Sequence, residues 1–160
     1  MKKAPSTLAA AIMLAVFLFL GNGNVLAQCS LCVSAVDYDC SGTFEECGTS
    51  TAGCSQSTIF QVACSGNYTL IAKIEGCTNA CNCNSCVLIE KVDSGTILRW
   101  LDSGCSGQHC SASVQVELAA GYDYRLYVCK RPCDEGLDCD DCDQQCKARG
   151  LIKYGVVSCP

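Results

Sequence analysis

The sequence has a single His, few basic residues and no long apolar run after residue 27, and each shortage excludes a class of function. His109 stands beside Cys110, but no second His can serve as the base of a Cys/His nucleophile. The 11 Lys and Arg residues are outnumbered by 16 Asp and Glu, so polyphosphate would be repelled and nucleic acid is not an expected partner. A length of 160 residues supports one domain rather than a multi-domain enzyme.

Residues 1–27 have the features of a removable export signal. Two Lys residues near the start precede an almost wholly apolar segment, 8–20, and a small-residue cleavage site ends at Ala27. We expect cleavage near Ala27 and a secreted protein, extracellular or periplasmic, without a membrane span. Two alternatives are a retained N-terminal anchor and lipidation of Cys29, which would leave an odd number of Cys residues.

Cysteine is abundant, with 18 residues that all follow residue 27. This density is typical of disulfide-stabilised secreted domains, and the even number allows every Cys to pair without a resident cofactor. Zinc is the alternative, since Cys-x2-Cys spacings occur at 29–32, 83–86 and 139–142, but export favours disulfides. The Cys residues are Cys29, Cys32, Cys40, Cys47, Cys54, Cys64, Cys77, Cys81, Cys83, Cys86, Cys105, Cys110, Cys129, Cys133, Cys139, Cys142, Cys146 and Cys159.

The disulfide connectivity stays open, although local spacing restricts two cases. Cys105 and Cys110 close a short loop, which favours a bridge between them. Cys142 and Cys146 are expected to have different partners, because Cβ atoms at i, i+4 on a helix lie about 5–6 Å apart, too far for a disulfide.

The pattern of the chain predicts a mainly β domain. Residues 28–57 are expected to form a Cys-rich stapled segment, 58–130 a β-sandwich core, and 131–160 an acidic Cys-rich extension packed on the same domain. Short runs rich in β-branched and aromatic residues, separated by Gly, Ser, Asn and Asp, predict an antiparallel sandwich or barrel. The predicted strands are 33–36, 59–64, 68–74, 86–92, 96–101, 112–118, 124–129 and 154–159.

Alternation of apolar and polar residues is clearest in the strands on either side of Gly121. The apolar residues Ala112, Val114, Val116, Leu118, Tyr124, Leu126 and Val128 are expected to face inward, and Ser113, Gln115, Glu117, Arg125 and Tyr127 outward. We expect these strands to form a closing hairpin, in which Val116 faces Leu126 and Glu117 faces Arg125.

A second hairpin is expected between strands 86–92 and 96–101. Ser94 and Gly95 would form its two-residue loop. In that register Glu90 faces Arg99, and opposite charges suit a solvated face of the sheet.

Two segments resemble a known family. Residues 113–128, an apolar strand that reaches a Gly turn and returns through an aromatic-rich strand, look like the closing hairpin of pre-peptidase C-terminal type domains of secreted bacterial proteins. Residues 87–101 are similar to the preceding hairpin of those domains. The resemblance covers roughly 60–129 and implies a jelly-roll-like sandwich with a non-catalytic accessory or binding role. Those domains are usually poor in Cys, unlike this chain.

The C-terminal region predicts a short helix. Asp138 would cap a helix over 140–149, whose start is acidic and whose end is basic, and Gly150 would terminate it. The acidic residues here are candidate calcium ligands, with a solvated acidic loop as the alternative. They are Asp134, Glu135, Asp138, Asp140, Asp141 and Asp143.

A second acidic segment starts at Asp37 and begins like an EF-hand calcium loop. It has Gly48 where the bidentate Glu is required, so a polar turn is expected instead.

The sequence predicts a non-catalytic, disulfide-stabilised β-sandwich with an extracellular binding or structural role toward carbohydrate or protein. Aromatic side chains could form a stacking platform, with cross-strand packing as the alternative. The candidates are Tyr68, Trp100, Tyr122, Tyr124, Tyr127 and Tyr154, of which outward-facing Tyr127 is the best. A protease inhibitor, with loop 106–109 as its binding loop, is a second reading. A defensin-like toxin belongs with it, because residues 142–159 resemble part of the defensin helix–strand motif. A small secreted hydrolase is the third, although the chain has no Gly-x-Ser-x-Gly elbow.

Overall fold

The computed structural model describes residues 29–38, 47–48, 50–76, 83–104, 110–133 and 146–155. The predicted export signal, residues 1–27, lies outside these ranges. The described residues form nine β-strands and no helix that could cross a membrane. The strands are β1 (Leu31–Asp37), β2 (Ser55–Gln56), β3 (Phe60–Gln61), β4 (Gly66–Glu75), β5 (Cys83–Lys91), β6 (Thr96–Asp102), β7 (Ser111–Leu118), β8 (Asp123–Pro132) and β9 (Lys147–Tyr154).

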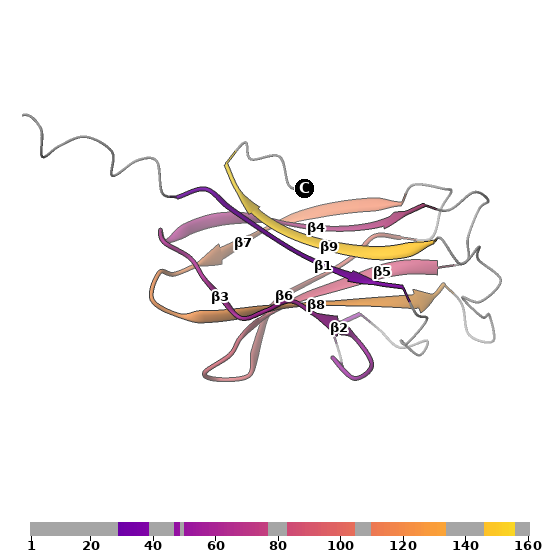
Figure 1. The fold of residues 1–160 in the computed structure, drawn as a ribbon, viewed down its shortest axis with the longest axis horizontal. Coiled ribbons are helices and arrows are strands. Elements are labelled where there is room, and N and C mark those ends of the chain that lie inside the picture. Colours follow the sequence, from indigo (N-terminus) through magenta and orange to yellow (C-terminus); the bar gives the residue numbers. More distant parts are fainter. Residues whose placement is uncertain are drawn as a thin grey trace, which may run out of the picture.

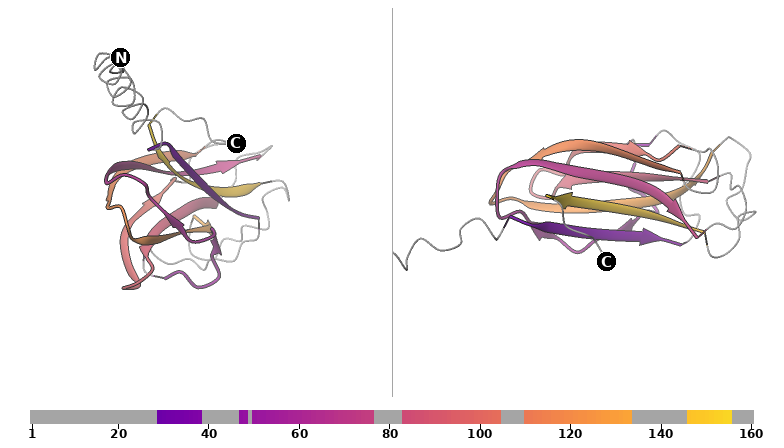
Figure 2. Two further views of the ribbon diagram at one scale, coloured as in Figure 1. Left: turned by 60° about the vertical axis from the view of Figure 1, so that its left-hand side comes forward. Right: turned by 90° about the horizontal axis from the view of Figure 1, so that it is seen from above.

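The strands form two antiparallel sheets that lie face to face (Figure 1). Sheet A has the order β1-β9-β4-β7, which Figure 2 shows from above, and sheet B has the order β2-β8-β5-β6, with β3 also paired to β8. Of the strands in the described ranges, only β5 and β6 are both consecutive and hydrogen-bonded neighbours. Every other connection between these strands, apart from that between β2 and β3, crosses from one sheet to the other. The predicted mainly β sandwich is confirmed.

The core lies between the sheets and is built from alternate residues of each strand. Leu70 of β4, Ile89 of β5 and Leu126 of β8 are fully buried in it. Tyr68 also lies there and donates a hydrogen bond to the Cys64 carbonyl oxygen at 2.6 Å. Burial, helped by the nearby Tyr154 hydroxyl, raises the pKa of Tyr68 above its ordinary value.

The inward and outward faces predicted on either side of Gly121 are confirmed, but the pairing is wrong. Val116, Leu118, Tyr124, Leu126 and Val128 are buried, whereas Ser113, Gln115 and Glu117 are exposed. Strand β7 pairs with β4 in sheet A, and β8 pairs with β5 in sheet B. The observed pairs include Tyr68–Val116, Asn67–Glu117, Ile89–Leu126 and Glu90–Arg125.

The reason for this error is that alternation identifies a buried face and not a partner. A strand that crosses the core to the opposite sheet buries the same residues as one that turns back within its own sheet. Gly121, with φ of 85°, lies in the turn at the crossing.

The hairpin between β5 and β6 is confirmed, with a different register. Thr96 lies opposite Lys91, so the turn contains residues 92–95 rather than two residues. A β-bulge between Ile89 and Glu90 then places Ile89 opposite Arg99 and Glu90 opposite Ile97. Glu90 and Arg99 therefore lie on opposite faces of the sheet, and their predicted pairing is wrong.

The predicted C-terminal helix, 140–149, is not supported, because its last residues, 147–149, begin strand β9. Residues 140–145 lie outside the described ranges. The last strand that the structure describes, β9, ends at Tyr154, where the predicted one was to begin, and residues 156–160 lie outside the described ranges. Gly150, expected to end the helix, instead lies in β9 where the sheets approach closely. A Cβ added there would lie 2.4 Å from Val128 Cγ2 and 2.9 Å from Val87 Cγ1.

Candidate functional site

A second, smaller apolar cluster lies on the outer face of sheet B. Cys86, Leu88 and Cys129 are fully buried there, although they point away from the main core. Strand β5 is therefore buried on both faces, which is why residues 86–89 form a continuous apolar run. Because these side chains are buried, another part of the chain must pack over them, and the residues around Cys47 and Cys54 do so.

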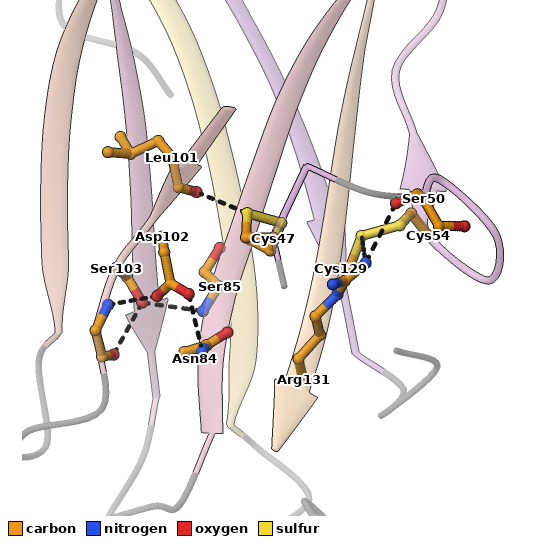
Figure 3. The surroundings of a disulfide bond; sticks show 12 residues. Cys47, Ser50, Cys54, Asn84, Ser85, Leu101, Asp102, Ser103, Cys129 and Arg131 are labelled. Atoms are coloured by element: carbon orange, nitrogen blue, oxygen red, sulfur yellow. Dashed lines mark hydrogen bonds between the residues drawn. A yellow bond between two sulfur atoms is a disulfide. The ribbon is translucent and has the colours of Figure 1, made fainter. Parts of the chain in front are cut away.

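Two disulfides hold this cover, here called the covering segment (residues 47–48 and 50–54), against the sheet (Figure 3). Cys47 is bonded to Cys86 of β5, and Cys54 is bonded to Cys129 of β8. The Arg131 guanidinium also donates a hydrogen bond to the Ser50 carbonyl oxygen at 3.2 Å. Both ends of the covering segment are thus tied to adjacent strands of sheet B.

The prediction of disulfides is confirmed for half of the 18 Cys residues. A third bridge joins Cys29 to Cys64. Cys32, Cys133 and Cys146 are also disulfide-bonded, so the zinc alternative is wrong for the 29–32 spacing. For the remaining Cys residues disulfide pairing stays a prediction. The bridge expected from Cys105 and the separate partners expected for Cys142 reach outside the described residues.

A pocket of about 290 Å³ opens between the covering segment and the β5–β6 hairpin. Leu88 and Glu90 of β5 and Ile97 of β6 supply its sheet side. The covering segment supplies the opposite wall through Gly48, Ser50 and Thr51, and Gly95 of the hairpin turn completes the lining.

Trp100 of β6 does not line this pocket, but it lies against Gly48, which does. It lies opposite Leu88 in the β5–β6 register, and its side chain is 53% exposed. A Cβ added to Gly48 would lie 2.5 Å from Trp100 Cδ1, so the indole packs directly against the Gly48 backbone. Gly48 also has φ of 99°, a second reason for glycine. Trp100, the only Trp in the chain, is one of the six aromatic residues that the sequence offered for stacking, but Tyr127 was preferred.

Among the described residues of the lining, Glu90 is the charged one, and a chain of hydrogen bonds fixes it. The Tyr127 hydroxyl donates to Glu90 Oε2 at 2.9 Å, and Arg125 donates to the Tyr127 hydroxyl at 3.3 Å. The other carboxylate oxygen, Oε1, lies toward Gly95, which also lines the pocket.

Tyr127 itself faces outward, as predicted, but its ring is half-buried against the apolar cluster. It lies between Gln56 of β2 and Leu88 of β5. This environment favours the cross-strand packing alternative for its ring, and makes Trp100 the better candidate for stacking.

The other candidate site residues fall in two groups. Asp37 is buried and serves the fold, because its carboxylate accepts hydrogen bonds from Ser55 Oγ at 3.1 Å and from the Lys130 backbone N–H at 2.9 Å. These bonds join sheet A to sheet B. The second group lies outside the described residues and comprises His109, loop 106–109, Asp134, Glu135, Asp138, Asp140, Asp141 and Asp143. Within the described residues, no cluster of metal-ligating side chains occurs.

Among the described residues, the outer face of sheet A carries ion pairs. Glu75 pairs with Lys73 and, at 3.6 Å, with Arg149. Partial burial opposes ionisation of Glu75, but the Lys73 hydrogen bond and the charges of Lys73, Arg149 and Lys147 outweigh it. The pKa of Glu75 is therefore below its ordinary value.

Comparison with protein-family models finds no match, and neither does comparison with curated proteins. Among solved structures, the chain is similar to the C-terminal CBM6 of LamC, a marine laminarinase from Zobellia galactanivorans (TM-score 0.38, 13% identity, 78% of this chain and 100% of that chain). It is also similar to the carbohydrate-binding module CBM6cm-2 of Cellvibrio mixtus lichenase 5A in complex with cellotriose (TM-score 0.36, 13% identity, 76% and 94%).

Proposed function

We propose that this protein is a secreted, non-catalytic binding module, and that its ligand is a carbohydrate held in the pocket beside Trp100. The observation that carries the proposal is an exposed indole next to a small pocket that also contains a fixed carboxylate. Export of the chain, which the first 27 residues predict, would place the module outside the cell.

The chemistry of the pocket suits a sugar. The C–H groups of a pyranose ring are apolar and pack against an aromatic face, which Trp100 offers beside Gly48 of the pocket wall. Sugar hydroxyls need donors and acceptors, and Glu90, Ser50 and Thr51 can provide them. A volume of about 290 Å³ is near the lower end for small-molecule sites, which suits one part of a longer glycan.

The disulfides support the same function. Because Cys47–Cys86 and Cys54–Cys129 hold the covering segment on the sheet, the pocket wall is in place before the ligand arrives. Less conformational entropy is then lost on binding, which favours affinity for a small, flexible ligand.

Calorimetric titration of the oxidised mature protein with soluble oligosaccharides from β-glucan, xylan, mannan and chitin tests the proposal. We expect at least one to bind, and Trp100→Ala to weaken its affinity roughly tenfold or more, because buried aromatic contacts dominate such sites. Tyr122→Ala is the matched control, since Tyr122 is 42% exposed but lies against Lys91, whereas Trp100 lies against Gly48 of the pocket wall. Absence of binding to all four, or equal binding by Trp100→Ala, would overturn the proposal.

A further inference from the structure

We infer that the pocket selects glycans that present hydrogen-bond donors to Glu90, whether hydroxyl or ammonium groups, and rejects carboxylated or sulfated glycans. This inference rests on the proposed function and names the chemistry of its ligand. Tyr127 acts in it as a positioning residue, because it fixes the carboxylate without lining the pocket.

The geometry of Glu90 is the first step. One carboxylate oxygen, Oε2, already accepts the Tyr127 hydroxyl at 2.9 Å, and this leaves Oε1, near Gly95, for a ligand. The Tyr127 ring is packed between neighbouring strands and cannot follow a mobile carboxylate. The Arg125 guanidinium, 3.3 Å from the same hydroxyl, polarises it toward Glu90 and strengthens the bond.

The charges around the pocket are the second step. An ionised carboxylate only accepts hydrogen bonds, so a group bound at Oε1 must donate. The nearby cations among the described residues already have other contacts. Arg125, opposite Glu90 in the register, donates to the Tyr127 hydroxyl. The Arg131 guanidinium donates to the Ser50 carbonyl oxygen. The Lys91 ammonium lies 3.3 Å from the centre of the Tyr122 ring. A uronate or sulfate placed here would therefore lie beside Glu90 with like charge.

Three oligosaccharides of equal length, a neutral glucan, a glucosamine oligomer and an oligouronate, test the inference by calorimetry. We expect the wild-type protein to bind the neutral or the amino oligomer, and the oligouronate about tenfold more weakly or not at all. Glu90→Gln should weaken the amino oligomer about tenfold and reduce the discrimination against the uronate. Tyr127→Phe should lower the amino-to-uronate ratio about two- to tenfold, because it removes one hydrogen bond but keeps the ring.

The control for net charge is Glu117→Gln, which makes the same charge change at an exposed position of sheet A. We expect it to leave all three affinities unchanged. Tight oligouronate binding by the wild type, or equal effects of Glu90→Gln and Glu117→Gln, would overturn the selectivity alone. Absence of binding by all three oligomers would overturn both the selectivity and the proposed carbohydrate function.

Discussion

The outer faces of the two sheets differ in chemistry, since one carries polar and charged side chains and the other an apolar cluster. On sheet A, the face carries charged and polar pairs that water can reach, such as Lys73 with Glu75 and Gln115 with Thr69. On sheet B, an apolar cluster around Leu88 is closed by the covering segment and its two disulfides. The two disulfides of sheet B therefore do more than restrict the unfolded chain. They hold the covering segment over the sheet and so form one wall of the pocket.

The largest loss of stability should come from removing either of two disulfides that close loops of similar length. One holds the covering segment on sheet B, and the other joins the residues that precede β1 and β4 of sheet A. Cys47–Cys86 spans 39 residues and Cys29–Cys64 spans 35. Replacing both Cys of either bridge by Ala should lower the free energy of unfolding by about 2–4 kcal/mol. Denaturant titration measures this change.

Carbohydrate binding should separate the two disulfide variants. Removing Cys47–Cys86 frees the pocket wall at Gly48, so affinity should fall, whereas removing Cys29–Cys64, which contributes no lining residue, should leave it intact. Retained affinity in the first variant would contradict the role assigned to the covering segment.

A smaller loss of stability is expected from a substitution in the core between the two sheets. Gly150→Ala should lower the free energy of unfolding by about 1–3 kcal/mol, because the new methyl group would collide with Val128 and Val87. The double variant Gly150→Ala/Val128→Ala should lose less than the sum of the single changes, since the truncated Val makes room. Strict additivity in denaturant titrations would show that close packing does not explain this glycine.

The smallest effect belongs to the ion pairs of sheet A. Because the folded pKa of Glu75 is lowered, its stabilisation is present above the ordinary value of 4.5 and is lost as the pH falls through the folded pKa. Glu75→Gln should therefore reduce the free energy of unfolding by about 0–1 kcal/mol at neutral pH. The difference between the two proteins should vanish in acid and should not affect carbohydrate binding. A difference that grows as the pH falls would contradict this sign.

The sequence was informative about faces and poor about partners. Alternation placed Val116, Leu126 and Val128 in the core, because a period of two leaves only one buried side. It could not reveal that β7 and β8 belong to different sheets, since both arrangements bury the same residues. The acidic-to-basic gradient before Gly150 has the pattern of a helix, and only the tertiary approach of Val128 and Val87 explains the glycine.

The sequence offered Trp100 as one of six aromatic candidates, but it could not reveal the pocket beside it, for two reasons. Disulfide connectivity among 18 Cys cannot be deduced from spacing, so nothing indicated that Cys47 and Cys54 fold over β5 and β8. The bulge at Ile89 and Glu90 is also invisible in the sequence. Without it Glu90 was paired with Arg99, and its place beside the pocket was missed.

Quenching of Trp100 fluorescence by acrylamide reports directly whether a bound carbohydrate stacks on the indole, because Trp100 is the only Trp in the chain and is half-exposed. A saturating oligosaccharide that stacks on the indole should shield it, so the quenching constant should fall on binding. The Tyr122→Ala control should show the same protection. A ligand that binds by calorimetry but leaves the quenching of Trp100 unchanged would place the carbohydrate elsewhere and contradict the account.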